Sequence, residues 1–225
     1  MDEYIFHLLN GINGKSGVLD FVLEASQRVV VKALPFMMVF WGLWFWTTSA
    51  DEDSRRRSAL LATLVATIPI VGITRAVANF GPFSERPITT PGLEVNIASH
   101  QDIAQLDGWS SMPSDHASLF MGLAVAILLI HRPAGIFLVF WAMCVSSIPR
   151  VILGLHWPSD LVVGWLLGAI IAICVLRFVP DVIYRSRLVP MFETRGYILY
   201  PLLFALTFEI ARMFLAVRSV LDLII

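Results

Sequence analysis

Residues 159–179 read S-D-L-V-V-G-W-L-L-G-A-I-I-A-I-C-V-L-R-F-V, an apolar run with one acid near its start and one arginine near its end. A helix needs about 20 apolar residues to cross the hydrocarbon core of a bilayer. The run is long enough, so it predicts a membrane-spanning helix. Pro158 precedes it and suits a first helical turn, where a missing N–H has no partner to lose.

Five further stretches have the same character, namely residues 29–48, 59–79, 117–131, 134–155 and 197–217. The stretch 117–131 is short for a span, so its helix is expected to begin within Pro113–His116. Residues 1–27 alternate between apolar and polar and are expected to form two short amphipathic helices on the outer membrane surface, with no removable signal peptide. We predict an all-α, polytopic membrane helix bundle with about six transmembrane helices, forming one domain over residues 1–225.

The composition agrees with this assignment. Hydrophobic residues make up 57% of the chain, charged residues 15%, and the mean hydropathy is +0.77. Soluble domains are about one-quarter charged, so these values exclude that class and predict an integral membrane protein. The formal net charge of -1 gives no sign of a nucleic-acid partner. Membrane lipids are the expected partners, and no obligate protein partner is indicated.

Basic residues predict the orientation in the membrane. They cluster between the first and second spans, between the third and fourth, and around the connection from the fifth to the sixth, at Arg55, Arg56, Arg57, Arg132, Arg177, Arg185, Arg187 and Arg195. Loops rich in Lys and Arg stay in the cytoplasm. Residues 80–112, with Glu85, Glu94, Asp102 and Asp107, and the turn around His156 are therefore expected outside, on a bacterial inner membrane.

Ionisable residues at the edges of these spans are the candidate catalytic groups, because charge is costly there and usually functional. His156 stands at the mouth of the fifth span, and Asp160 can accept its Nδ1 proton, leaving Nε2 free to attack phosphorus. Arg150 can donate paired hydrogen bonds to phosphate oxygens. His116 can protonate the leaving oxygen. The pattern indicates phosphoryl transfer at a membrane surface.

Further groups complete the predicted anion site. The backbone N–H groups of Ser114 and Asp115 face the start of the third span, and Arg86-Pro87 adds a cation on the same side. Arginines neutralise the phosphate oxygens without a metal, so no metal or other cofactor is expected. For four other residues a structural role is expected rather than a catalytic one. Glu209 and Arg212 are expected to pair on one helix face, while Cys144 and Cys174 are expected to be buried small apolar residues.

The pieces Arg86-Pro87, Pro113-Ser114-Asp115-His116 and Arg150 through His156 to Asp160 resemble the three signature motifs of the type 2 phosphatidic acid phosphatase superfamily. These are membrane lipid phosphatases related to the vanadium haloperoxidases. The resemblance implies that His156 forms a phosphohistidine, that Asp160 orients it and that His116 is the general acid. It further implies that Arg86, Arg150 and Ser114 bind phosphate without a metal.

The chain departs from these motifs in three places. Pro149 stands where the third motif usually has serine, and Asp115 replaces a frequent glycine. Asn79 stands where the first motif usually has lysine. Arg75 lies one helical turn away on the same face, so we expect it to supply the missing cation, with Asn79 as a supporting donor. The alternative is that Arg75 snorkels or pairs with a carboxylate.

These features predict a lipid phosphate or diphosphate phosphatase whose active site faces the periplasm or the outside. Undecaprenyl diphosphate is the favoured substrate, and phosphatidylglycerol phosphate, phosphatidic acid and lipid A phosphates are the alternatives. A lipid phosphotransferase would use the same phosphohistidine. A transporter subunit or scaffold with a phosphate-binding pocket is the non-enzymatic alternative, although such a pocket needs cations and not both His116 and His156.

Overall fold

The structure is a computed structural model, and it describes residues 1–97 and 110–214. Every regular element within these ranges is helical. In chain order the elements are α1 (Asp2–Asn10), α2 (Gly17–Gln27), α3 (Val29–Phe45), α4 (Ala50–Phe80), η1 (Pro87–Thr89), α5 (Asp115–Ile130), α6 (Arg132–Trp141), η3 (Ala142–Ser147), α7 (Ile148–Ile152), α8 (Pro158–Arg185), α9 (Met191–Thr194) and α10 (Gly196–Ala211). The predicted all-α class is confirmed.

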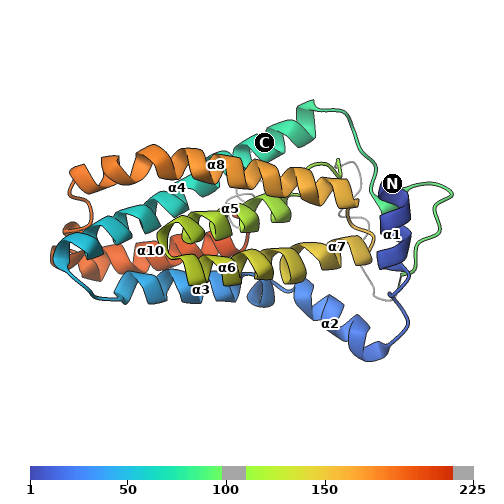
Figure 1. Ribbon diagram of the computed structural model, residues 1–225, viewed down its shortest axis with the longest axis horizontal. Helices are drawn as coiled ribbons and strands as arrows, with labels where there is room; N and C mark the ends of the chain where they lie inside the picture. The colour runs from blue at the N-terminus through green and yellow to red at the C-terminus, as the bar shows by residue number, and fades with distance from the viewer. Residues whose placement is uncertain (98–109, 215–225) are drawn as a thin grey trace.

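The long helices run side by side along the long axis of the molecule, and α1 lies across one end of them (Figure 1). We call this the α1 end; it comprises α1, η1, α7 and the first turns of α5 and α8. The opposite end, called the α3–α4 end, comprises residues 45–57 and 177–195. Helix α5 is central, because it packs against α8, α4 and α6.

Three helical stretches are long and apolar enough to cross a membrane: α4, residues Arg132–Ile152 and α8. The pair α2 and α3, bent by 56° where they meet, would make a fourth. Helices α5 and α10 have 16 residues each and fall short of that length. The expected number of six spans is therefore not confirmed. The third apolar stretch does begin within its motif, at Asp115, as predicted, whereas residues 215–217 of the sixth lie outside the described residues.

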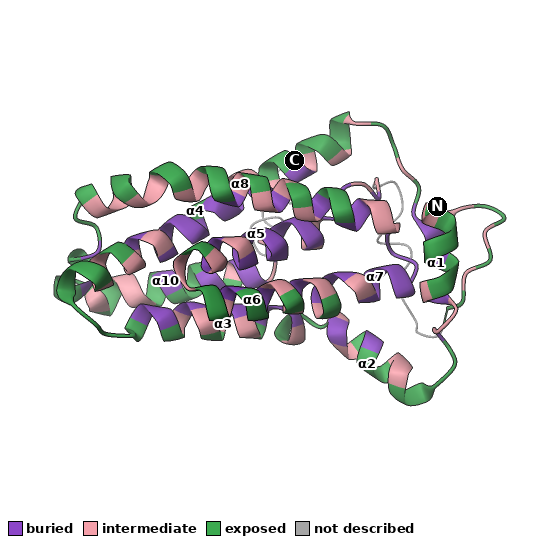
Figure 2. Cartoon of the chain, in the orientation of Figure 1, coloured by how far each residue is buried: buried purple, intermediate pink, exposed green. Residues whose placement is uncertain are grey.

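The exposed faces of the long helices, green in Figure 2, carry many large apolar side chains. On α8, Val162, Leu166, Ile170 and Ile173 follow one another at helical spacing and are all about half exposed. A continuous exposed apolar face is unfavourable in water and suited to lipid. This face and the apolar spans identify an integral membrane protein. Cys144 and Cys174 are also exposed, contrary to the expected burial, because they lie on outer faces rather than at helix contacts.

Glycines bring α5 and α8 into close contact near the α1 end. A Cβ atom on Gly168 would lie 2.0 Å from the carbonyl oxygen of Ser118, and one on Gly164 would lie 2.9 Å from that of Ser114. Small residues four apart allow membrane helices to approach closely. The backbone N–H of Ser114 also donates to the carbonyl oxygen of Asp160 at 3.2 Å. The start of α5 is therefore held against the start of α8.

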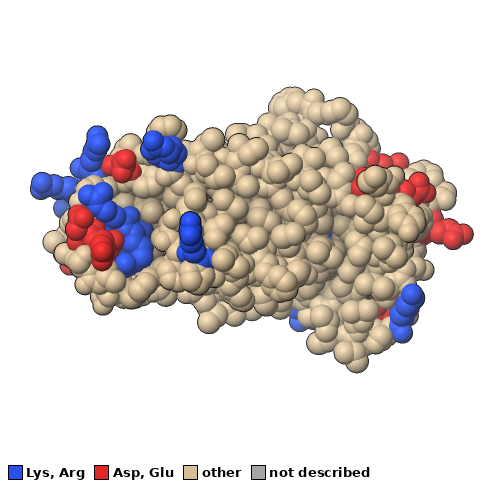
Figure 3. All heavy atoms as spheres, in the orientation of Figure 1, with Lys and Arg blue, Asp and Glu red and all other residues tan. Residues whose placement is uncertain are grey.

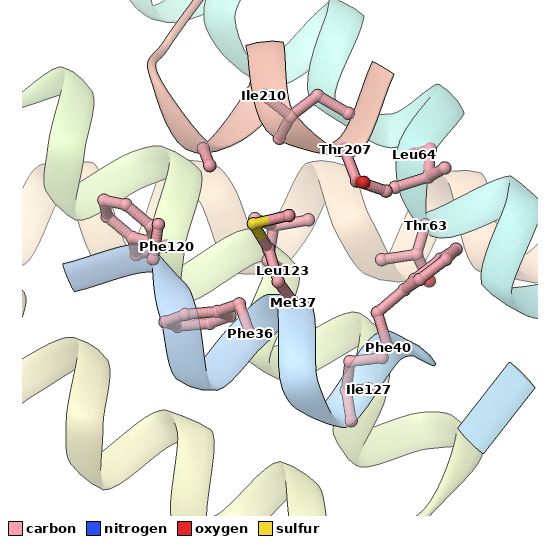
Figure 4. A pocket seen from close by; sticks show the side chains of 12 residues that line it. Phe36, Met37, Phe40, Thr63, Leu64, Phe120, Leu123, Ile127, Thr207 and Ile210 are labelled. Atoms are coloured by element: carbon pink, nitrogen blue, oxygen red, sulfur yellow. The ribbon is translucent and has the colours of Figure 1, made fainter. Parts of the chain in front are cut away.

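A small cavity of about 40 Å³ lies inside the bundle between α3, α4, α5 and α10 (Figure 4). Its lining is aliphatic and aromatic apart from the hydroxyls of Thr63 and Thr207. Each hydroxyl donates to a carbonyl oxygen of its own helix, at 3.0 Å and 2.9 Å respectively. The cavity has no ionisable lining group. The candidate catalytic residues lie instead at the ends of the helices.

Candidate active site

The turn between α7 and α8 brings two sequence motifs together. Gly154 has a φ of +76°, a conformation that side chains rarely adopt. Its carbonyl oxygen accepts the N–H of Ile88 in η1 at 2.9 Å. The guanidinium of Arg86 then donates to the carbonyl oxygen of Leu155 at 2.8 Å. The Arg86-Pro87 motif is thereby fastened to the turn that carries His156, although almost 70 residues separate them in sequence.

His156 is buried, and its two ring nitrogens have different surroundings. Nδ1 lies 2.9 Å from the carbonyl oxygen of Ser111 and 3.4 Å from a carboxylate oxygen of Asp160. Both neighbours are acceptors, so Nδ1 carries the proton. Nε2 lies 3.3 Å from a guanidinium nitrogen of Arg86 and 3.3 Å from one of Arg150. The Nε2 lone pair therefore points toward two cations, where a phosphate group would be held.

Asp160 is fully buried, and one of its carboxylate oxygens accepts more than one hydrogen bond. Its Oδ2 accepts the backbone N–H of Trp157 at 2.8 Å, which caps the start of α8. The same oxygen accepts the hydroxyl of Ser111. Ser111 thus joins Asp160 to His156, since its carbonyl oxygen is the nearer acceptor for Nδ1. Sequence reasoning missed Ser111, which lies 45 residues before His156 and two before the P-S-D-H motif.

The two arginines beside His156 are both more than nine-tenths buried. The second nitrogen of Arg150 donates to the side-chain oxygen of Gln27 at the end of α2, at 3.2 Å. Over the described part of the chain, neither Arg86 nor Arg150 has a carboxylate within ion-pairing distance. Burial lowers the pKa of Arg86, which shows that its charge is held at a cost. Two buried cations without matching anions make a site for an anionic ligand.

The first turn of α5 holds the remaining predicted residues. Ser114 is its N-cap and is fully buried, and its Oγ has no hydrogen-bond partner within the described ranges. His116 is half-buried, with its ring centroid 6.3 Å from that of Phe120. Asp115 forms an ion pair with Arg75 at 2.5 Å. An oriented, unpaired hydroxyl at a helix N-terminus suits a phosphate oxygen.

The ion pair with Asp115 confirms the alternative that Arg75 pairs with a carboxylate. Its role in phosphate binding stays a prediction. Asn79 is exposed and Pro87 is buried in η1. The predicted pair of Glu209 and Arg212 is present, at 3.9 Å.

The environment of His156 favours the neutral imidazole. Burial, opposed by the hydrogen bond to Asp160 and reinforced by the charges of Arg150 and Arg86, lowers the pKa of His156 to about 4. The ring is then unprotonated at neutral pH and its Nε2 lone pair is available. A nucleophile with an oriented ring and adjacent cations can transfer a phosphoryl group.

Comparison with known proteins agrees with this geometry. Residues 86–184 match the sequence model of the PAP2 superfamily. A relative from Bacillus licheniformis, named bacitracin transport permease protein BcrC, is 28% identical over 84% of this chain and 85% of its own length. Undecaprenyl-diphosphatase BcrC of Bacillus subtilis is 23% identical over 79% of this chain and 84% of its own. Lipid A 4'-phosphatase of Bacteroides thetaiotaomicron is 41% identical, over 27% of this chain and 28% of its own.

Proposed function

We propose, from the premise that this chain belongs to the PAP2 superfamily, that it hydrolyses a lipid diphosphate through a phosphohistidine on His156. The family makes the chain a membrane lipid phosphatase, and the proposal adds the substrate and the intermediate. One observation carries it: Nε2 of His156 faces Arg86 and Arg150, each at 3.3 Å. Two buried cations can neutralise the phosphate oxygens while Nε2 approaches phosphorus.

The first step forms an Nε2–P bond to the terminal phosphorus and breaks the bond between that phosphorus and the bridging oxygen. His116 donates its proton to the bridging oxygen, and the lipid monophosphate leaves. In the second step His116 takes a proton from water, the water oxygen bonds to phosphorus, and the Nε2–P bond breaks, which releases inorganic phosphate and restores His156. Ser111 and Asp160 hold the Nδ1 proton throughout, so that Nε2 remains the reacting atom.

Undecaprenyl diphosphate is the substrate that we propose first. The relative from Bacillus subtilis that carries this activity in its name aligns with this chain over 84% of its own length. Lipid A phosphate is the second candidate, because the relative named for that activity shares 41% identity over a shorter segment. Phosphatidic acid and phosphatidylglycerol phosphate would use the same site chemistry.

Two other functions use the same site. A phosphotransferase would pass the phosphoryl group to a lipid or glycan instead of water. Transport is the activity in the name of the relative from Bacillus licheniformis. A transport pocket needs the cations of Arg86 and Arg150 but not a histidine whose Nδ1 proton is held by two acceptors, and this observation favours hydrolysis.

Release of inorganic phosphate from a lipid panel tests the proposal. The purified chain in detergent should release phosphate from undecaprenyl diphosphate faster than from lipid A, phosphatidic acid or phosphatidylglycerol phosphate. Activity should persist in EDTA, and vanadate should inhibit competitively, because it adopts the five-coordinate shape of the transition state. Transfer to an added acceptor lipid without phosphate release would indicate the phosphotransferase instead.

We further propose that the α1 end faces the periplasm or the outside of a bacterial inner membrane. The arginines of the α3–α4 end support this orientation through the positive-inside tendency. In a variant lacking Cys144 and Cys174, a cysteine at Glu94 should react with an impermeant thiol reagent in intact cells, and one at Ser186 should not. Both positions are exposed. Reversed labelling would put the site in the cytoplasm. Asp102 and Asp107, which are expected on the same side, lie outside the described residues.

A further inference from the structure

Lys32 is a buried cation that neither the sequence motifs nor the proposed mechanism uses. It lies in the first turns of α3, and only 5% of its surface is exposed. Within the described residues its ammonium group has no hydrogen-bond or ion-pair partner. Lysine is almost never fully buried without a partner, because removing its charge from water is costly. A buried lysine side chain without a carboxylate partner among the described residues therefore indicates an anion that the ligand itself supplies.

The position of Lys32 relates it to the active site. One guanidinium nitrogen of Arg150 contacts His156, and another donates a hydrogen bond to the side-chain oxygen of Gln27, the last residue of α2. The guanidinium thus extends from His156 toward the junction of α2 and α3. Lys32 lies five residues beyond Gln27, on a helix that packs against η3, and its charge interacts with that of Arg150. Lys32 therefore lies in the first turns of the helix that follows the junction toward which the guanidinium of Arg150 extends.

We propose that Lys32 binds the second phosphate group of a diphosphate substrate. This inference rests on the proposed function. Arg86 and Arg150 flank Nε2 of His156 and hold the phosphate that is attacked. A monophosphate has no other phosphate group, so these two arginines bind its only one. A diphosphate presents a second anionic group, and Lys32 is the further buried cation beside Arg150. Lys32 is then a specificity residue that favours diphosphates over monophosphates.

The plainer explanation is that Lys32 snorkels to the membrane surface. Arg28 has the position and exposure that snorkelling requires, since it lies one turn earlier at the start of α3 and is exposed. Lys32 differs from Arg28, because only 5% of its surface is exposed. The two residues therefore form a matched pair, with similar charge and helix position but different burial.

The test compares Lys32→Met with Arg28→Met. The substrates are a prenyl diphosphate and the monophosphate of the same prenyl chain. We expect Lys32→Met to lower kcat/KM for the diphosphate by about 10- to 100-fold, as for loss of one hydrogen bond to a charged group. The monophosphate should change by less than about threefold. Lys32→Arg should recover part of the diphosphate activity, and Arg28→Met should alter neither substrate.

A thermal measurement separates binding from a structural role. Removing a buried, unpaired charge should leave the Tm of the ligand-free protein unchanged or raise it. Inorganic pyrophosphate should raise the Tm of the wild type more than that of Lys32→Met, while inorganic phosphate should shift both alike. Equal loss of activity toward both substrates, or a lower Tm for Lys32→Met that Lys32→Arg does not restore, would overturn the inference. A wild type that releases phosphate from neither substrate would instead overturn the proposed function.

Discussion

The two ends of the bundle both contain arginines, but they hold them in different ways. At the α3–α4 end, Arg55 is 60% exposed and pairs with Asp51 at 2.9 Å, and Arg56 pairs with Asp53 at 2.7 Å. At the α1 end, Arg86 and Arg150 are more than nine-tenths buried and contact a carbonyl oxygen, an amide oxygen and the ring of His156. The first set is matched by carboxylates, and the second is not.

Figure 3 shows the same contrast on the molecular surface. Basic and acidic side chains gather together at the α3–α4 end, whereas the surface of the α1 end shows mainly acidic ones. The cations of the candidate site lie beneath that surface. Exposed ion pairs contribute little to stability and can be replaced at small cost. Buried, unmatched cations lower stability, so their presence points to an anion that binds there.

The largest expected effect concerns the group that the buried arginines surround. His156→Ala should lower phosphate release by about 10⁴-fold or more, because the nucleophile is lost. Rapid quench with radiolabelled lipid should trap an acid-labile phosphoprotein in the wild type and none in the variant. His7→Ala is the control, since His7 is an exposed histidine on α1. Normal turnover by His156→Ala would rule out the covalent mechanism.

Replacing one arginine at each end tests the contrast directly. Arg150→Gln should lower kcat by about 10²- to 10³-fold, by analogy with the loss of one donor to a transition-state anion. Arg55→Gln should change kcat by less than about twofold, since an exposed ion pair is lost. Arg150→Lys should recover only part, because an ammonium group lacks the planar fork. Equal effects at the two ends would show that burial does not mark function in this protein.

The pH dependence of His156 sharpens the contrast further. With its pKa lowered to about 4, His156 stays neutral as the pH falls from 7 to 5. At an ordinary pKa of about 6.5 the neutral fraction would fall about 25-fold over that range. In ¹⁵N-histidine NMR of the protein in micelles, the resonance missing from His156→Ala should therefore not titrate above pH 5. A midpoint near the ordinary value would mean that the cations and burial do not act on this ring.

Among the charged residues beside the site, the smallest effect is expected for Arg75, which combines features of both ends. It lies beside the site, but its charge is already matched by Asp115. Arg75→Ala should reduce kcat by about tenfold, through the loss of one charged hydrogen bond, and Asn79→Ala should have less effect because Asn79 is exposed. Steady-state kinetics of Arg75→Ala with and without Asp115→Asn will show which role dominates. Recovery in the double variant would assign Arg75 to neutralising Asp115, and no recovery would assign it to phosphate.

Sequence alone predicted the features that depend on nearby residues. The apolar run 159–179 predicted the membrane-spanning helix α8, because the length and composition of the run are properties of that segment alone. His156 and Asp160 lie four apart around a helix start, so their proximity follows from helix geometry. Arg150, six residues before His156, also belongs to the same short segment, and the structure places it against that ring. The number of spans was harder to predict, because α2 and α3 meet at a bend and α5 and α10 are short.

Only the tertiary structure decided the contacts between distant segments. Helix packing places the carbonyl oxygen of Ser111 at Nδ1 of His156. It also sets the hydrogen bond from Arg150 to Gln27 and the burial of Lys32. Hydropathy records whether a residue favours water or hydrocarbon, but it does not record which helices meet. Close packing at Gly164 and Gly168 sets that partnership for α5 and α8. The packing of the bundle therefore determines which arginines pair with a carboxylate and which are buried without one.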